Sequence, residues 1–312
     1  MADAGIKETD KLLEELEKKI KKEYKKAGKE AQDKLDNYLK EFKNKDTKML
    51  KAVEEGSLTK SAYKKWRTSE MVVGKKWEEL KNVLAKEYTE ASIKAMGMTN
   101  ETMKSVYALN HNISTFEIEK ASFVNTQYAL YDKSTVERLI KKNPKLLPDP
   151  KVDIKKSNLW NQQKINSAVT QGILQGEPID KIARRLDQVT GMGERSALRS
   201  ARTMVTSAQN AGRMDSYKRA EEMGIEMEKV WVATIDERTR ASHVFLHGEA
   251  VGIYEQFSNG LEYPADPNGD PEEVYNCRCV MVPRVKGVEL GLEGFNEEYI
   301  EENFADWERR RK

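Results

Sequence analysis

The first 50 residues constrain the fold most, because their apolar side chains recur at helical spacing while the positions between them are mostly charged. The spacing repeats as intervals of three, four and four residues, an 11-residue period that matches a nearly straight α-helix better than a left-handed heptad coil. The apolar positions are Leu13, Leu16, Ile20, Tyr24, Ala27, Ala31, Leu35, Tyr38 and Phe42. The pattern predicts one long N-terminal helix with a narrow buried stripe and a wide solvated face.

Glycines and prolines divide the rest of the first two thirds into further predicted helices. Gly56 interrupts the first helix, Ser69 is expected to open a second, and Gly97 is expected to end it. Three prolines between residues 143 and 160 predict a connection, because proline breaks a helix. Further helices are expected over residues 157–175, 178–186 and 194–223, with Gly191 and Gly193 in a turn before the last of them.

After Gly224 the apolar pattern changes from helical to strand-like. Strands are expected at residues 230–234 and 280–282, with a short helix over 239–246 between them and a last helix over 296–311. The sequence therefore predicts an α+β fold, in which a mainly helical body with a long N-terminal helix is followed by a small C-terminal α+β module. We expect a helical N-terminal region over residues 1–150, a helical middle region over 151–225 and the module over 226–312.

Composition and charge limit the possible functions. Charged residues make up 34% of the 312, and no apolar run approaches the roughly 18 residues that span a bilayer, so no membrane partner is expected. The first residues lack a hydrophobic signal segment, and two cysteines are too few for a disulfide framework, so a reducing cytosol is the expected site of synthesis. The net charge is +5 over residues 1–104, +6 over 105–225 and −9 over 226–312, which makes double-stranded DNA a candidate partner for the basic part, residues 1–225.

Candidate metal ligands are concentrated between Trp231 and Cys279. On a helix, His243 and His247 would lie one turn apart on one face, and Cys277 and Cys279 on a strand would share a face. Two imidazoles and two thiolates could complete a tetrahedral zinc site. The alternative is that the cysteines are small buried core residues and that His243 bonds to Asp236 or to the backbone.

The same region also offers candidate catalytic residues. Asp236 is expected to cap the short helix that opens at Arg238 or Thr239, and Arg238 to reach back to a carboxylate or a carbonyl. A metal-dependent hydrolase or nuclease built on His243, His247, Asp236 and the cysteine pair is the alternative function. The sequence lacks the HExxH, GxSxG and phosphate-binding glycine motifs, so no known catalytic motif completes such a site.

The ordered motifs of this region resemble the signature of the Mu F-like minor head proteins of tailed bacteriophages, also called the head-morphogenesis family. The resemblance rests on Asp236, Arg238, Thr239, Arg240, His243, Gly248, a loop rich in proline and aspartate, and Asn276, Cys277, Arg278 and Cys279, preceded by a helix over residues 202–211. It covers residues 201–283. One departure is His247, where a family member often has aspartate, and this weakens the four-ligand zinc hypothesis.

The resemblance implies a minor capsid protein that acts in head morphogenesis and has no catalytic residues. Its implied partners are the portal protein and other head or scaffold proteins, and its implied location is the virion, in the head interior or at the portal vertex. DNA packaging and DNA ejection are the steps in which such proteins are thought to act. In this interpretation the signature residues hold the C-terminal module together.

Overall fold

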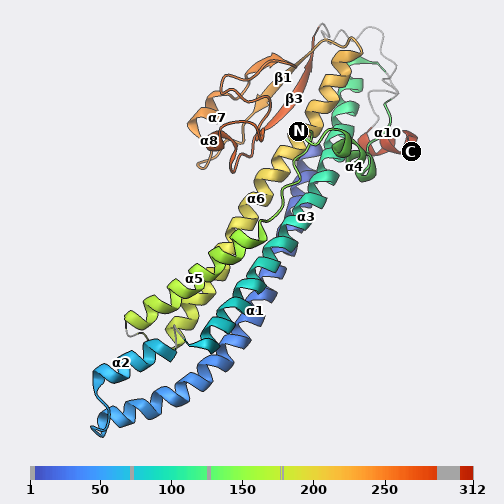
Figure 1. Cartoon of the computed structure of the whole chain (residues 1–312). Coiled ribbons are helices and arrows are strands. Elements are labelled where there is room, and N and C mark those ends of the chain that lie inside the picture. Colours follow the sequence, from blue (N-terminus) through green and yellow to red (C-terminus); the bar gives the residue numbers. More distant parts are fainter. Residues whose placement is uncertain are drawn as a thin grey trace. The chain divides into compact units, whose positions relative to one another are not determined.

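The structure is a computed structural model that describes residues 4–70, 74–124, 128–175, 177, 179–286 and 303–311. The expected helix starts at Pro178 and Asn296 lie outside these residues. The helices are α1 (Ala4–Glu54), α2 (Lys60–Thr68), α3 (Lys75–Ser122), α4 (Lys133–Lys142), α5 (Ile154–Leu174), α6 (Ile179–Glu222), α7 (Ala241–Phe245), α8 (Pro271–Val274) and α10 (Phe304–Arg311). The strands are β1 (Met227–Val232), β2 (Ala250–Gly252) and β3 (Val280–Val285) (Figure 1).

The chain forms two compact units, each assembled from segments that are distant in sequence. Unit 1 comprises Met1–Glu17, Met98–Pro150 and Arg199–Lys312, and unit 2 comprises Lys18–Gly97 and Lys151–Leu198. The three expected regions, 1–150, 151–225 and 226–312, stay a prediction. No helix in the described part of the chain has the length and apolar character needed to cross a membrane.

The expected long N-terminal helix is confirmed as α1. Its apolar stripe is buried from Leu16 to Phe42, apart from Tyr38, which is half-buried, and it also includes Leu39. The helix ends at Glu54, and Gly56 follows with a positive φ of 76°, a conformation that glycine adopts without steric cost.

Three interior helix boundaries were predicted wrongly. Helix α3 begins at Lys75 and continues through Gly97, whereas Ser69 is the C-cap of α2. Helix α6 continues through Gly191 and Gly193, which were expected to form a turn. A glycine inside a helix costs about 1 kcal/mol, which packing along a 44-residue helix outweighs. At Gly193 the absent side chain also makes room, because a Cβ there would lie 3.1 Å from the Tyr24 ring.

The C-terminal module contains a three-stranded antiparallel sheet in the order β2–β1–β3, which confirms the mainly helical α+β fold class. Strand β1 alternates between buried and half-buried residues, as expected for a sheet with one face on a core. In the register, Val230 pairs with Ala250 and Trp231 pairs with Met281. The expected strand at 230–234 therefore begins three residues earlier, at Met227, and ends at Val232.

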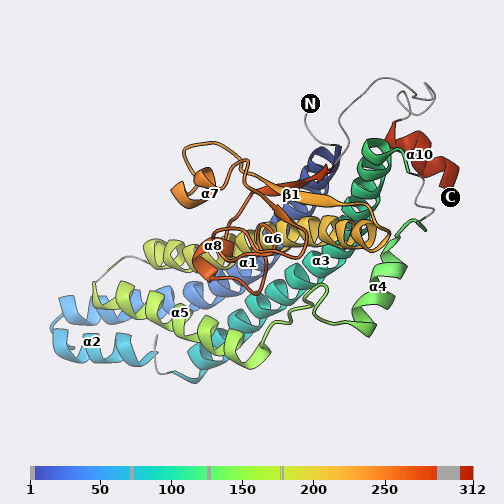
Figure 2. The ribbon, with the colours of Figure 1, turned by 90° about the horizontal axis from the view of Figure 1, so that it is seen from above.

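Within unit 1 the sheet lies beside the C-terminal part of α6 (Figures 1 and 2). The Asn210 side chain donates to the carbonyl of Cys279 at 3.1 Å and accepts from the backbone N–H of Met281 at 3.1 Å. The buried Arg213 donates to the carbonyl of Met281 at 3.0 Å. These bonds from one helix fix the start of β3, and with it the segment that carries both cysteines.

Candidate functional site

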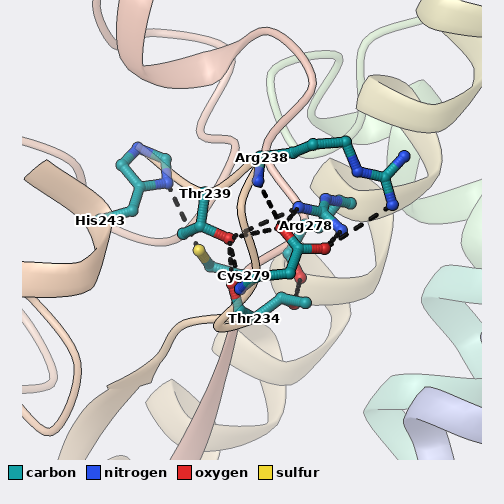
Figure 3. Close-up of polar contacts among 7 residues, drawn as sticks. Thr234, Arg238, Thr239, His243, Arg278 and Cys279 are labelled. Atoms are coloured by element: carbon teal, nitrogen blue, oxygen red, sulfur yellow. Dashed lines mark hydrogen bonds and ion pairs between the residues drawn. The ribbon is translucent and has the colours of Figure 1, made fainter. Parts of the chain in front are cut away.

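The signature residues after β1 form a latch around the Asp236 carboxylate. Arg278 donates two hydrogen bonds to it, both at 2.6 Å, and the backbone N–H of Arg238 donates a third at 2.9 Å (Figure 3). The hydrogen bonds from Arg278 hold the pKa of the Asp236 carboxyl well below its ordinary value. The carboxylate therefore stays charged at pH values at which an ordinary aspartate becomes protonated.

Hydroxyl groups extend this latch to the ends of the strands. Thr239 donates its hydroxyl hydrogen to the carbonyl of Thr234, and the Thr234 hydroxyl donates to the carbonyl of Arg278 at 2.8 Å (Figure 3). The Arg238 guanidinium, in contrast, is 82% exposed and lies 3.6 Å from Asp236. The chain leaving β1 is therefore tied to the segment entering β3, with Arg278 as the main cation of the latch.

Two further signature positions have backbone roles. Gly248 has a φ of 85° and donates its N–H to the carbonyl of Trp231 at 2.8 Å, which ties the turn between α7 and β2 to strand β1. Asn276 also has a positive φ, 58°, and its N–H donates to the hydroxyl of Thr203 on α6 at 3.0 Å. Asparagine is one of the residues that tolerate this conformation, and here it precedes Cys277 directly.

His243 and the two cysteines form a buried cluster. The Nδ1 atom of His243 lies 3.4 Å from the sulfur of Cys279 and 3.7 Å from the sulfur of Cys277 (Figure 3 shows the first contact). Its Nε2 atom lies 2.9 Å from a carboxylate oxygen of Glu273. The ligand atoms of His243, Cys277 and Cys279 all lie within 4.8 Å of one another, and each of these residues is at most 2% exposed.

The cluster distributes charge unevenly between its two thiols. The hydrogen bond from Cys277 lowers the pKa of Cys279, and His243 lowers it further, although burial opposes both effects. The same hydrogen bond and burial raise the pKa of Cys277. Burial lowers the pKa of His243, but the neighbouring Cys279 outweighs that effect, so that the pKa is raised overall. Of the two thiols, Cys279 is therefore the one that loses its proton more readily.

The structure does not bring His247 into this cluster. Helix α7 ends at Phe245, so the expected shared helical face does not form, and the His247 Nδ1 instead accepts the N–H of Ala233 at 3.2 Å. The cysteines also differ from expectation, because they precede β3 instead of lying on it. Their sulfurs nevertheless converge on His243, since Asn276 turns the chain immediately before them.

The carboxylate that orients His243 is Glu273 and not Asp236. Glu273 lies on α8, the helix capped by Asp270, and it also accepts from Asn259 at 3.1 Å and from Ser242 at 3.1 Å. Sequence reasoning missed this residue because it lies 30 positions from His243, in a stretch with several other acids. The pairing depends on the tertiary fold alone.

The arrangement allows two kinds of chemistry. A cysteine, a histidine and a carboxylate in this order resemble a nucleophilic triad. A nucleophile must reach its substrate, however, and both thiols are buried, so the arrangement does not favour nucleophilic chemistry. A metal ion needs no such access once bound, and His243, Cys277 and Cys279 are the residues here that could hold one.

Comparison with known proteins places this site in a family. The family model "Phage Mu protein F like protein" matches residues 163–282, which include α6, β1, β2, the start of β3 and every signature residue. Minor head protein GP7 of Bacillus phage SPP1 is 27% identical over 278 residues, which cover 88% of this chain and 87% of that protein. These two matches support a Mu F-like minor head family for this chain. This confirms the resemblance seen in the sequence.

Two other relatives match a smaller part of the chain. The NAD(+)–arginine ADP-ribosyltransferase EFV of Enterococcus faecalis is 33% identical over 137 residues, 43% of this chain and 28% of that protein. Protein YqbB of Bacillus subtilis is 27% identical over 144 residues, 44% of this chain and 46% of that protein. The chain thus spans less than half of these two family relatives. No solved structure matches the chain.

Proposed function

We propose that this chain is a structural component of a phage head that acts in head morphogenesis at the portal vertex, without catalysis of its own. The observation that carries the proposal is the match to minor head protein GP7, because it extends over nearly the full length of both chains. The match to the ADP-ribosyltransferase involves 28% of that protein, so we do not extend its activity to this chain.

The geometry of the signature supports a structural role. Asp236, Arg278, Thr239 and Thr234 bond to one another or to backbone groups. A hydrolase that used Asp236 as a metal ligand would need that carboxylate free, whereas Arg278 binds both of its oxygens. The latch accounts for this part of the family signature by its contribution to the fold.

The charge distribution supports the choice of partners. Residues 1–225 carry a net charge of +11 and residues 226–312 one of −9. We propose that the basic helices contact packaged DNA and that the acidic module docks on the portal protein or another head protein, inside the virion. DNA contact of this kind is sensitive to salt, because it depends on the release of counterions.

Co-expression with the portal protein of the same phage tests the proposal. We expect a complex of fixed stoichiometry on size-exclusion chromatography with light scattering. A matched pair of variants sharpens the test: Arg278→Ala opens the latch and should weaken the complex, whereas Arg238→Ala removes an exposed arginine next to the same carboxylate and should not. Failure of the wild-type chain to bind the portal protein would contradict docking at the portal vertex.

A further inference from the structure

We infer that His243, Cys277 and Cys279 bind one thiophilic divalent metal ion, with zinc as the expected occupant, through the histidine Nδ1 and both cysteine sulfurs. The three residues come from two segments, α7 and the turn before β3, and the fold brings their donor atoms to one point. The inference is independent of the proposed role in the phage head.

The spacing of the donor atoms fits a shared tetrahedral ion. Zinc binds sulfur at about 2.3 Å and histidine nitrogen at about 2.0–2.1 Å, so a nitrogen and a sulfur on one tetrahedral zinc lie about 3.5 Å apart. The two nitrogen–sulfur distances at His243 are 3.4 Å and 3.7 Å. One nitrogen thus faces two sulfurs at nearly equal distance, although it has a single lone pair or a single hydrogen with which to bond them.

The other side of the imidazole is arranged as in known metal sites. A histidine that binds a metal through one nitrogen almost always donates the other N–H to a carboxylate or a carbonyl, which fixes the tautomer and the ring. Here Glu273 accepts from Nε2 at 2.9 Å and is itself held by Asn259 and Ser242. The edge of the His243 ring also packs against the buried Trp231, with 5.4 Å between ring centroids. Nδ1 is therefore the nitrogen left for the metal.

Charge balance favours a divalent ion at this depth. Two thiolates and a neutral imidazole carry a net charge of −2, which a divalent cation neutralises, so the bound site avoids the cost of a buried net charge. Binding releases the protons held by the thiols and the imidazole. A small pocket lined by Thr234, Thr239 and Asn276, among others, borders the three ligands, and a water molecule there is the expected fourth ligand.

Metal content of the full chain is the direct test. The protein is produced with zinc in the medium, purified under reducing conditions and desalted. Its zinc content per chain is then measured by elemental mass spectrometry. We expect about one zinc ion per chain. Cys279→Ser and His243→Ala should reduce the content to background. His247→Asn is the matched control, because its amide oxygen can replace Nδ1 as acceptor for the Ala233 N–H, and it should retain the metal.

A second measurement needs no variant and so does not depend on how the variants fold. Cobalt added to metal-free wild-type protein should give sulfur-to-cobalt charge-transfer absorption and the visible bands of tetrahedral cobalt. A chelator should lower the Tm of the wild-type chain and leave that of Cys279→Ser unchanged. Folded, reduced wild-type protein that takes up neither metal would overturn the inference. Equal metal retention by Cys279→Ser, or a Cys277–Cys279 disulfide in place of metal, would overturn it as well.

Discussion

The two compact units differ in what they bury. Unit 2 buries mainly apolar side chains, such as Leu35, Trp77, Leu84 and Ile165, and has ion pairs such as Lys76–Glu41 on its exposed surface. Unit 1 buries, besides apolar residues, most of the polar and charged side chains of the described core. They include Asn110, His111, Asn112, Ser114, Thr115, Asn210, Arg213, Ser216, Lys229 and His243.

This difference predicts how each unit responds to substitution. An apolar stripe tolerates other apolar side chains of similar volume, because hydrophobic burial is not directional. A buried polar group needs a hydrogen-bond partner at the right distance and angle. Removing that partner costs the full desolvation free energy of the polar group that is left unpaired. Unit 1 should therefore be more sensitive than unit 2 to changes that preserve the size of a buried side chain but alter its hydrogen bonding.

The largest expected effect is at Gly212, where α6 approaches α3 in unit 1. A Cβ at this position would lie 2.3 Å from the carbonyl oxygen of Tyr107, so Gly212→Ala should lower the free energy of unfolding by about 3 kcal/mol. The matched control is Gly97→Ala in α3, where nothing lies within 4 Å and better helix propensity should add about 1 kcal/mol. Urea denaturation compares the two, and equal effects would show that the close approach is absent.

Acid should destabilise unit 1 through His111. Burial lowers the pKa of this imidazole to about 4, with Asp215 opposing and Arg219 adding to the effect. Between pH 6.5 and about 4 the unfolded chain binds a proton that the folded chain does not bind. The free energy of unfolding therefore decreases as the pH is lowered, by about 3 kcal/mol near pH 4.

His111→Phe isolates this contribution. Phenylalanine keeps the stacking on Tyr131, whose ring centroid lies 3.7 Å away, but does not titrate. Denaturation midpoints measured from pH 7 to pH 4 should fall less steeply for the variant than for the wild type. Parallel curves for the two proteins would contradict the assignment to His111.

A smaller loss is expected when the latch is opened. Arg278→Ala removes both guanidinium hydrogen bonds from Asp236 and should lower the Tm measurably, while the pKa of Asp236 rises toward its ordinary value. Arg238→Ala should leave both quantities unchanged, because that guanidinium is exposed. Thermal denaturation and a titration followed by NMR distinguish these outcomes, and a reversed ranking of the two arginines would refute the latch.

The smallest effect is expected at the surface of unit 2. Lys76 and Glu41 form an ion pair at 2.8 Å, and both side chains are largely exposed. Exposed pairs of this kind contribute little, because water and salt screen them. Lys76→Ala should therefore leave the Tm unchanged within error, in both low and high salt. A clear drop would mean that charge, and not the apolar stripe, stabilises this unit.

The same contrast explains how much of the fold could be predicted from the sequence. The α1 stripe was predictable because periodic burial is a local signal, and Leu16 through Phe42 show it position by position. The continuity of α3 through Gly97 and of α6 through Gly193 was not predictable, because packing between distant segments overrides the low helix propensity of glycine.

The site was predictable to the extent that it is encoded by residue type. The sequence offered His243, Cys277 and Cys279, together with His247, as candidate ligands of one zinc site, and the structure brings the first three side chains together. His247 was included on the assumption of a longer helix, but α7 ends at Phe245. Glu273 was missed, and so were the bonds from Asn210 to β3, because both depend on how loops and helices meet in three dimensions.

Quantitative mass spectrometry of purified phage heads tests the central claim most directly. If this chain is a structural head component, heads purified through a density gradient contain it in a fixed, low ratio to the major capsid protein. The ratio should be unchanged by a salt wash that removes adsorbed proteins. Absence of the chain from such heads, when it is abundant in the infected cell, would contradict the account.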